Sequence, residues 1–172
     1  MAAGDAEGAL LPISSALDAT ATRHFGRPGR SSYKAFLHKN LSLITRVGFG
    51  RTILNINLRY RHPDLKATPG DSHPIQDILY HVVRCGLSHS AALPETLRFV
   101  DERKFQVEDD LLVLPSSLIY GFIVSVVVCP ENSDQSLSDE YGLNVCGIQV
   151  MLNDLWGRRD ILDDLFEKAS AI

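Results

Sequence analysis

Two nitrogen-bearing side chains, Arg84 and His89, lie five residues apart and have the chemistry to act on a phosphodiester. An imidazole that titrates near neutrality can take the proton of a ribose 2′-OH or protonate the leaving oxygen. A guanidinium can hold the phosphate bidentately and stabilise the negative charge that develops on it. The pair therefore predicts metal-independent RNA transesterification, with Arg84 and His89 as catalytic residues and with no metal and no cofactor.

The helical spacing of this pair constrains how it could work. On an unbroken helix the two residues would diverge by about 140° and rise by about 7.5 Å. They converge only where the helix is distorted or where a second chain intervenes. A purely structural alternative stays open, in which Arg84 pairs with Asp77 or Glu95 and His89 closes a helix end, where imidazolium complements the helix dipole.

A metal site is a further alternative for the same stretch. His81, Cys85 and His89 share one helix face at i, i+4 and i+8 and offer nitrogen and sulfur ligands to a soft metal. No fourth ligand lies nearby in the sequence, so we expect no metal.

Helices must position these residues. Asp71 to Pro74 reads as a cap followed by a first-turn proline, and the apolar face from Ile75 to Val83 predicts a helix from Pro74 towards Leu87. The apolar spacing from Tyr33 to Val47 predicts a second amphipathic helix. Thr52 to Tyr60 would resume as a helix after two glycines.

The second half of the chain mixes both element types. Short apolar runs between Leu97 and Leu114 and between Leu143 and Leu152 predict strand pairs or hairpins. A C-terminal helix, capped by Asn153 or Asp154, follows. Leu118 to Val128 is consistent with a strand or a buried helix, because periodicity does not separate the two.

Length and composition indicate one soluble domain. The chain has 172 residues, 45% of them hydrophobic and 22% charged, so a core needs no disulfide staple. Residues 1–32 read as a partly mobile segment with a short helix, and residues 33–172 as the single folded domain. No run is apolar enough to span a bilayer, acids stand where a signal peptide needs cations, and three cysteines without CxxC spacing fit reduced thiols. We therefore expect a cytoplasmic protein that does not enter the membrane.

Charge is distributed unevenly along the chain. The net charge is −4, yet residues 1–66 carry a balance of +6 and residues 67–172 one of −10. A positive surface would attract phosphates, and Arg46, Arg51, Arg59 and Arg61 are the predicted RNA-binding residues. Mutual neutralisation of the two halves is the alternative.

The segment Arg84-Cys-Gly-Leu-Ser-His89 resembles the R-x4-6-H signature of HEPN-like domains, at a comparable place near the end of a helix. The pattern from about Tyr33 to Pro130 is also similar to that family. The resemblance implies a mainly α fold, an up-and-down helical bundle with one or two small β-hairpins inserted.

The resemblance also implies a function. Many HEPN-like proteins are metal-independent endoribonucleases that dimerise so that the Arg/His pairs of both protomers face one RNA cleft. Carried over, Arg84 would contact the scissile phosphate and His89 would be the general acid/base. The expected partners are a second copy of the chain, RNA, and an antitoxin or other protein. Cys85 departs from the family, whose active members place a polar residue after the arginine, and so favours the alternative of a catalytically silent interaction or dimerisation module.

Overall fold

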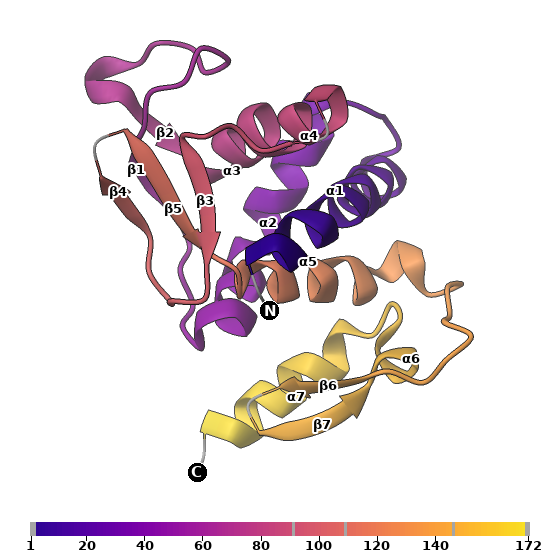
Figure 1. Ribbon diagram of the computed structural model, residues 1–172. Coiled ribbons are helices and arrows are strands. Elements are labelled where there is room, and N and C mark those ends of the chain that lie inside the picture. The colour runs from indigo at the N-terminus through magenta and orange to yellow at the C-terminus, as the bar shows by residue number, and fades with distance from the viewer. Residues whose placement is uncertain (1–2, 91, 109, 146, 171–172) are drawn as a thin grey trace.

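The computed structural model describes residues 3–90, 92–108, 110–145 and 147–170. About 53% of the chain is helical and 16% is in strands, which confirms the mainly helical class (Figure 1). The helical elements are α1 (Ala3–Phe25), α2 (Arg30–Phe49), η1 (Pro69–Asp71), α3 (Ile75–Ile78), η2 (Leu79–Arg84), α4 (Cys85–Ser90), α5 (Leu118–Val127), η3 (Pro130–Asn132), α6 (Leu152–Leu155) and α7 (Arg159–Ser170). The strands are β1 (Asn57–Arg59), β2 (Ser72–Pro74), β3 (Leu97–Val100), β4 (Gln106–Glu108), β5 (Leu111–Pro115), β6 (Gly142–Val145) and β7 (Ile148–Met151).

The first helix differs from the expectation for residues 1–32. Instead of a short helix in a loosely held segment, α1 runs for 23 residues and continues through Pro12. Leu10, Leu17 and Ala21 lie on one face and are buried in the main core. Their burial offsets the hydrogen bond lost at a proline inside a helix, so the folded unit includes α1.

The helix predicted from Pro74 is present but is not regular. It begins as α3, widens into the π-helical η2 and ends as α4. π-helical turns of this kind are rare and are frequent at functional sites. The predicted helix around Tyr33 to Val47 is also confirmed, as α2, which Gly50 ends in a left-handed conformation with its N–H on the Arg46 carbonyl.

Strands replace one of the expected helices. The segment from Thr52 to Tyr60 is not helical; it is a loop followed by β1, which pairs antiparallel with β2. The expected strands between Leu97 and Leu114 form a sheet of order β3-β5-β4, in which β4 and β5 are antiparallel and β3 lies parallel to β5. The predicted hairpin near the C-terminus is confirmed as β6 and β7.

The C-terminal helix is broken in two. Gly157 has a φ of +70° between α6 and α7 and donates its N–H to the Val127 carbonyl. A Cβ at this position would lie 2.5 Å from the Ser133 side chain, so the chain turns here under close packing. Asn153 does not cap the helix. Its side-chain oxygen accepts a hydrogen bond from the Leu137 backbone N–H, and its side-chain nitrogen donates one to the Leu137 carbonyl.

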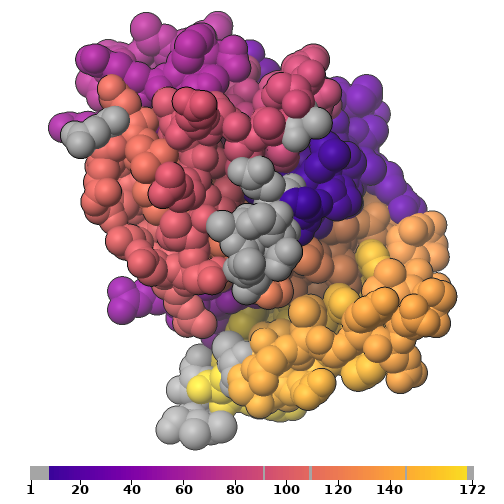
Figure 2. Space-filling model, viewed as in Figure 1, coloured from indigo at the N-terminus to yellow at the C-terminus, as the bar shows by residue number. Residues whose placement is uncertain are grey.

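The ambiguous segment from Leu118 to Val128 is helix α5, and it lies between two apolar clusters. Leu118, Ile119, Phe122 and Val126 belong to the main core, which α1 to α4 and the β3-β5-β4 sheet share. Val124, Val127 and Val128 belong to a second core with β6, β7, α6 and α7. Figure 1 shows this C-terminal group below α5, and in Figure 2 it forms the lower part of the visible face. Because α5 is buried against both clusters, its β-branched run forms a helix despite its preference for strands.

Close backbone contact joins α5 to α2. A Cβ on Gly121 would lie 2.3 Å from the Ile44 carbonyl oxygen, and one on Gly48 would lie 3.1 Å from that of Ser117. Glycine at both positions lets the backbones of α2 and α5 pack directly against each other. None of the described helices is both long and apolar enough to cross a membrane.

We predict that Gly121→Ala lowers the free energy of unfolding by about 1–3 kcal/mol, because the added methyl group meets backbone that has no room to move. Urea unfolding of the purified variants measures this change. Gly8→Ala is the matched control, since a Cβ at Gly8 meets nothing within 4 Å. That variant should be neutral or more stable by up to about 1 kcal/mol. Equal stability of the two variants would contradict the close crossing.

Candidate functional site

Arg84 is tied to the first helix. It ends the π-helical turn η2, and its Nη2 donates a hydrogen bond to Asp18 Oδ2 on α1 at 2.8 Å. Its guanidinium carbon lies 5.5 Å from the centroid of the Tyr80 ring. The two side chains of the ion pair are 28% and 27% exposed. Neither of the partners considered from the sequence, Asp77 or Glu95, is the one observed.

Buried polar groups surround this ion pair. The hydrogen bond that Arg84 donates to Asp18 raises the pKa of Arg84, which keeps the guanidinium charged. Burial raises the pKa of Tyr33, whose hydroxyl is bonded to Ser14 and stays neutral. Ser14, Asp18 and Tyr33 therefore form a polar seam between α1 and α2 in which Arg84 supplies the positive charge.

His89 is exposed on α4, whereas Arg84 is bonded to Asp18 on α1. Arg84 is the last residue of the π-helical turn, and the residues that follow it, Cys85–Ser90, are α-helical, so the chain between Arg84 and His89 is a regular helix. The pair thus keeps the divergent geometry of a regular helix. A joint site of the two predicted catalytic residues would therefore need a second chain, and the catalytic pair stays a prediction.

The alternative metal ligands are also apart. Within the described part of the chain, His81, Cys85 and His89 are not gathered at metal-ligand spacing. The reason is that His81 lies inside the wide η2 turn, which breaks the i, i+4 alignment. Desolvation, with the charges of Arg30 and Lys34, lowers the pKa of His81.

Two of the four predicted RNA-binding residues already make contacts within the chain. Arg46 donates to the Phe166 carbonyl at 3.1 Å, and its guanidinium lies 4.2 Å from the centroid of the Phe166 ring. Arg61 pairs with Asp71 across a loop. Arg51 and Arg59 are exposed.

A pocket forms around Arg51 at the C-terminal end of α2. Its volume is about 410 Å³, and we call it the two-arginine pocket; it is lined by Phe49, Arg51, Ile53, Arg103 and Phe105. Arg51 and Arg103 are both exposed, and the two phenyl rings are partly buried with centroids 5.1 Å apart. Figure 1 shows how the β3–β4 loop, which carries Arg103, comes beside the segment that follows α2.

A second hollow extends this surface. It has a volume of about 360 Å³ and shares Arg103 with the two-arginine pocket. Tyr120, 45% exposed on α5, lies on its wall. An arginine thus stands between two concave regions, and each region has an aromatic side chain.

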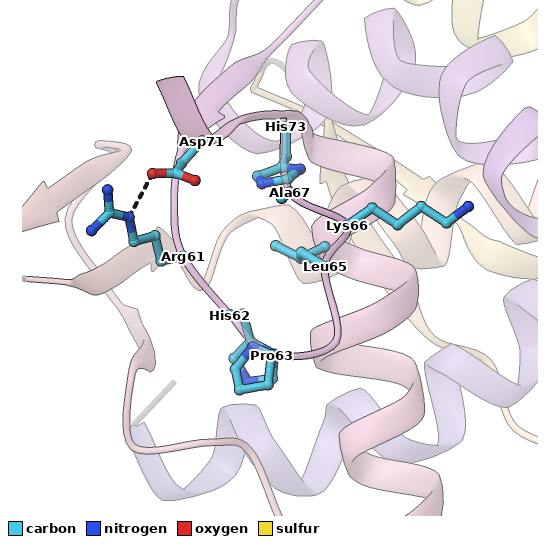
Figure 3. Close-up of a pocket in the computed structure, with 8 residues that line it drawn as sticks. All are labelled: Arg61, His62, Pro63, Leu65, Lys66, Ala67, Asp71 and His73. Atoms are coloured by element: carbon cyan, nitrogen blue, oxygen red, sulfur yellow. Dashed lines mark hydrogen bonds and ion pairs between the residues drawn. The ribbon is translucent and has the colours of Figure 1, made fainter. Parts of the chain in front are cut away.

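The loop between β1 and β2 encloses a third pocket, of about 270 Å³ (Figure 3). The Arg61–Asp71 pair crosses the loop, and His62 and His73 contribute imidazoles from its two arms. His62 stacks on Tyr60 at a centroid distance of 6.0 Å, and His73 is buried. The Arg61 guanidinium is thereby neutralised by a carboxylate, which weakens this pocket as a phosphate site.

Sequence reasoning missed three of the residues that shape these sites. Asp18 lies 66 positions from Arg84, and no local pattern links the two. Arg103 and Phe105 belong to a charged turn between two short strands, which reads as solvated surface. The signal available was the pairing of Arg103 with a nearby aromatic residue, a combination typical of single-stranded nucleic-acid contacts.

Comparison with known proteins identifies a family. A family model described as Rv1289 matches residues 1–172. Neither a search of curated proteins nor one of solved structures finds a match.

We predict that Arg84→Ala lowers the free energy of unfolding by about 1–3 kcal/mol, because Asp18 is left half-buried without its partner. Denaturant unfolding measures the effect. His89→Ala, at an exposed position, should change stability by less than about 0.5 kcal/mol. An Arg84→Ala variant as stable as the wild type would show that the ion pair with Asp18 does not hold the helices together.

Proposed function

The chain belongs to the Rv1289 family, and we propose that it is a catalytically silent, HEPN-like module that binds single-stranded RNA at the two-arginine pocket. The observation that carries this proposal is the presence of two exposed arginines and two phenyl rings around one cavity. The HEPN-like part of the proposal rests on the resemblance of the segment from Arg84 to His89 to the family signature.

The chemistry of the pocket suits a nucleotide chain. Every base has a flat face that stacks on an aromatic ring, and each stacked base contributes about 1–3 kcal/mol. Arg51 and Arg103 each offer a planar fork of donors that matches a phosphate. A volume of about 410 Å³ lies within the range of small-ligand sites. Bases and phosphates would thus meet complementary groups in one place.

The overall charge argues for a local contact. With a net charge of −4, the protein as a whole repels a polyanion. Binding must therefore depend on a few well-placed cations, and the salt dependence should be shallow. Two phosphate contacts to a single strand predict a slope of log K against log salt of about −1.4.

The same geometry argues against catalysis in the single chain. Arg84 is bonded to Asp18, and His89 lies apart from it at the surface. Cleavage would require Arg84 to leave its carboxylate and a second protomer to bring the missing group. The ribonuclease hypothesis with a homodimer cleft stays a prediction, and it has a separate readout in the test below.

We predict that wild-type protein binds a labelled, unstructured oligonucleotide in EDTA, as measured by fluorescence anisotropy. Arg103→Ala should weaken binding about tenfold and reduce the salt slope to about −0.7, because one phosphate contact is lost. Phe105→Leu should weaken binding while leaving the salt slope unchanged. Arg27→Ala is the control, since Arg27 is exposed but lies at the opposite end of α2, roughly 30 Å away along the helix.

Loss of binding in Arg27→Ala equal to that in Arg103→Ala would reject the two-arginine pocket as the site. The same mixtures, resolved on a denaturing gel, test the alternative that the protein is a ribonuclease. Cleavage by the wild type, but not by an Arg84→Ala, His89→Ala double variant, would overturn the catalytically silent reading and support the ribonuclease.

A further inference from the structure

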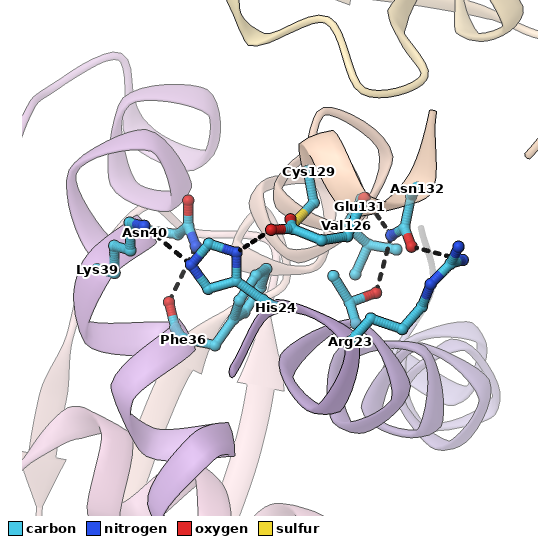
Figure 4. Close-up of polar contacts among 10 residues, drawn as sticks. Arg23, His24, Phe36, Lys39, Asn40, Val126, Cys129, Glu131 and Asn132 are labelled. Atoms are coloured by element: carbon cyan, nitrogen blue, oxygen red, sulfur yellow. Dashed lines mark hydrogen bonds and ion pairs between the residues drawn. The ribbon is translucent and has the colours of Figure 1, made fainter. Parts of the chain in front are cut away.

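Three potential metal ligands meet where the end of α1 packs against the segment after α5. His24 lies in the last turn of α1, and Cys129 and Glu131 flank Pro130 at the start of η3 (Figure 4). His24 Nδ1 is 2.8 Å from Glu131 Oε1, and Cys129 Sγ is 3.0 Å from Glu131 Oε2. All three ligand atoms lie within 4.8 Å of one another.

These groups are shielded from solvent. Cys129 is 6% exposed, and the His24 and Glu131 side chains are 17% and 32% exposed. Burial, reinforced by the hydrogen bond to Glu131, raises the pKa of the Cys129 thiol to about 12. Hydrogen bonds from the thiol and from His24 lower the pKa of Glu131 to about 2, against the effect of desolvation. Without a cation, the cluster is thus a carboxylate held between a neutral thiol and an imidazole.

We propose that His24 Nδ1, Cys129 Sγ and the Glu131 carboxylate bind a zinc-like divalent cation. One imidazole, one thiolate and one carboxylate is a donor set that suits zinc and disfavours magnesium or calcium. Tetrahedral zinc places such ligand atoms roughly 3.3–3.7 Å apart. The two separations that involve Glu131, 2.8 Å to His24 and 3.0 Å to Cys129, reach this range with a small outward shift of the Glu131 carboxylate. This proposal differs from the sequence-based expectation that the protein binds no metal.

Charge and protons balance on binding. The cation displaces the thiol proton to solvent, and His24 carries its remaining proton on Nε2 instead of Nδ1. A thiolate and a carboxylate then neutralise the two charges of the ion. Lys39 Nζ, which now lies 2.8 Å from His24 Nε2, must turn away, and its exposed position leaves it free to do so.

A fourth coordination position is open. A cavity of about 160 Å³ borders His24 and Cys129, with Lys39, Asn40 and Arg159 on its walls. It has room for a water molecule as the fourth ligand, the arrangement of three-residue zinc sites.

The surrounding fold holds the ligands in place without the metal. The buried Asn132 amide donates to Thr20 Oγ1 on α1 at 2.9 Å and to the Val126 carbonyl on α5 at 2.8 Å. These bonds join the same two segments that supply the ligands, as Figure 4 shows. Ligand substitution should therefore affect metal binding more than folding.

We predict that the full chain, stripped with a chelator, binds one equivalent of Co²⁺ with a thiolate-to-metal charge-transfer band, and that Zn²⁺ displaces it. Cys129→Ser should abolish the band. Cys129→Ser and His24→Gln should weaken Zn²⁺ binding at least about 100-fold, beyond the roughly 10–100-fold loss seen for groups that only orient ligands. Competition with a chromophoric chelator measures the affinity.

Cys85→Ser and Cys146→Ser are the matched controls and should keep the band. A wild type that shows no charge-transfer band at saturating Co²⁺ would overturn the proposal, as would a band that survives Cys129→Ser. If Cys129→Ser fails to fold by circular dichroism, His24→Gln carries the test, because it leaves the buried sulfur in place. A His24→Gln variant that binds Zn²⁺ as tightly as the wild type would also overturn the proposed metal site.

Discussion

The close crossing of α2 and α5 is the constraint on which the rest of the molecule depends. Because Gly121 has no Cβ, the α5 backbone lies against the backbone of Ile44, and no larger side chain fits there. This contact fixes the position of α5, and α5 then supplies side chains to both apolar clusters. The C-terminal group of β6, β7, α6 and α7 therefore depends on a contact between two helices that lie outside it.

The helical part of the fold follows from apolar spacing, whereas the irregular parts depend on distant partners. The faces of α2 and of the helix from Ile75 are readable from the sequence because each is amphipathic. The sequence does not identify α5 as a helix, because a segment buried on both sides has no polar face that would show a helical period. Helix α1 contains Pro12, a local signal against a helix that core packing overrides.

The candidate sites show the same division. Local sequence identifies Arg84 and His89 as chemically interesting, but the partner of Arg84 is Asp18, on another helix. The sequence predicts Arg51 as an RNA-binding residue, but Arg103 and Phe105 complete its pocket only because the β3–β4 loop folds back to the end of α2. His24 and Glu131 stand 107 positions apart and carry no joint motif. Sites assembled from several segments are specified by the tertiary fold, so single-sequence spacing does not detect them.

Ion pairing across the chain bears on the proposed RNA contact, because it neutralises some of the basic side chains. The basic residues of segment 1–66 are in part neutralised by acids of segment 67–172, since Arg23 pairs with Asp134 and Lys34 with Asp77. This supports mutual neutralisation over one broad positive surface. A polyanion therefore gains most where exposed cations stand beside aromatic rings, as Arg51 and Arg103 do at the end of α2. The His24 cluster contacts α2 at Lys39, about ten residues and roughly 15 Å earlier along the same helix, so the two proposed sites are separate and can be lost one at a time.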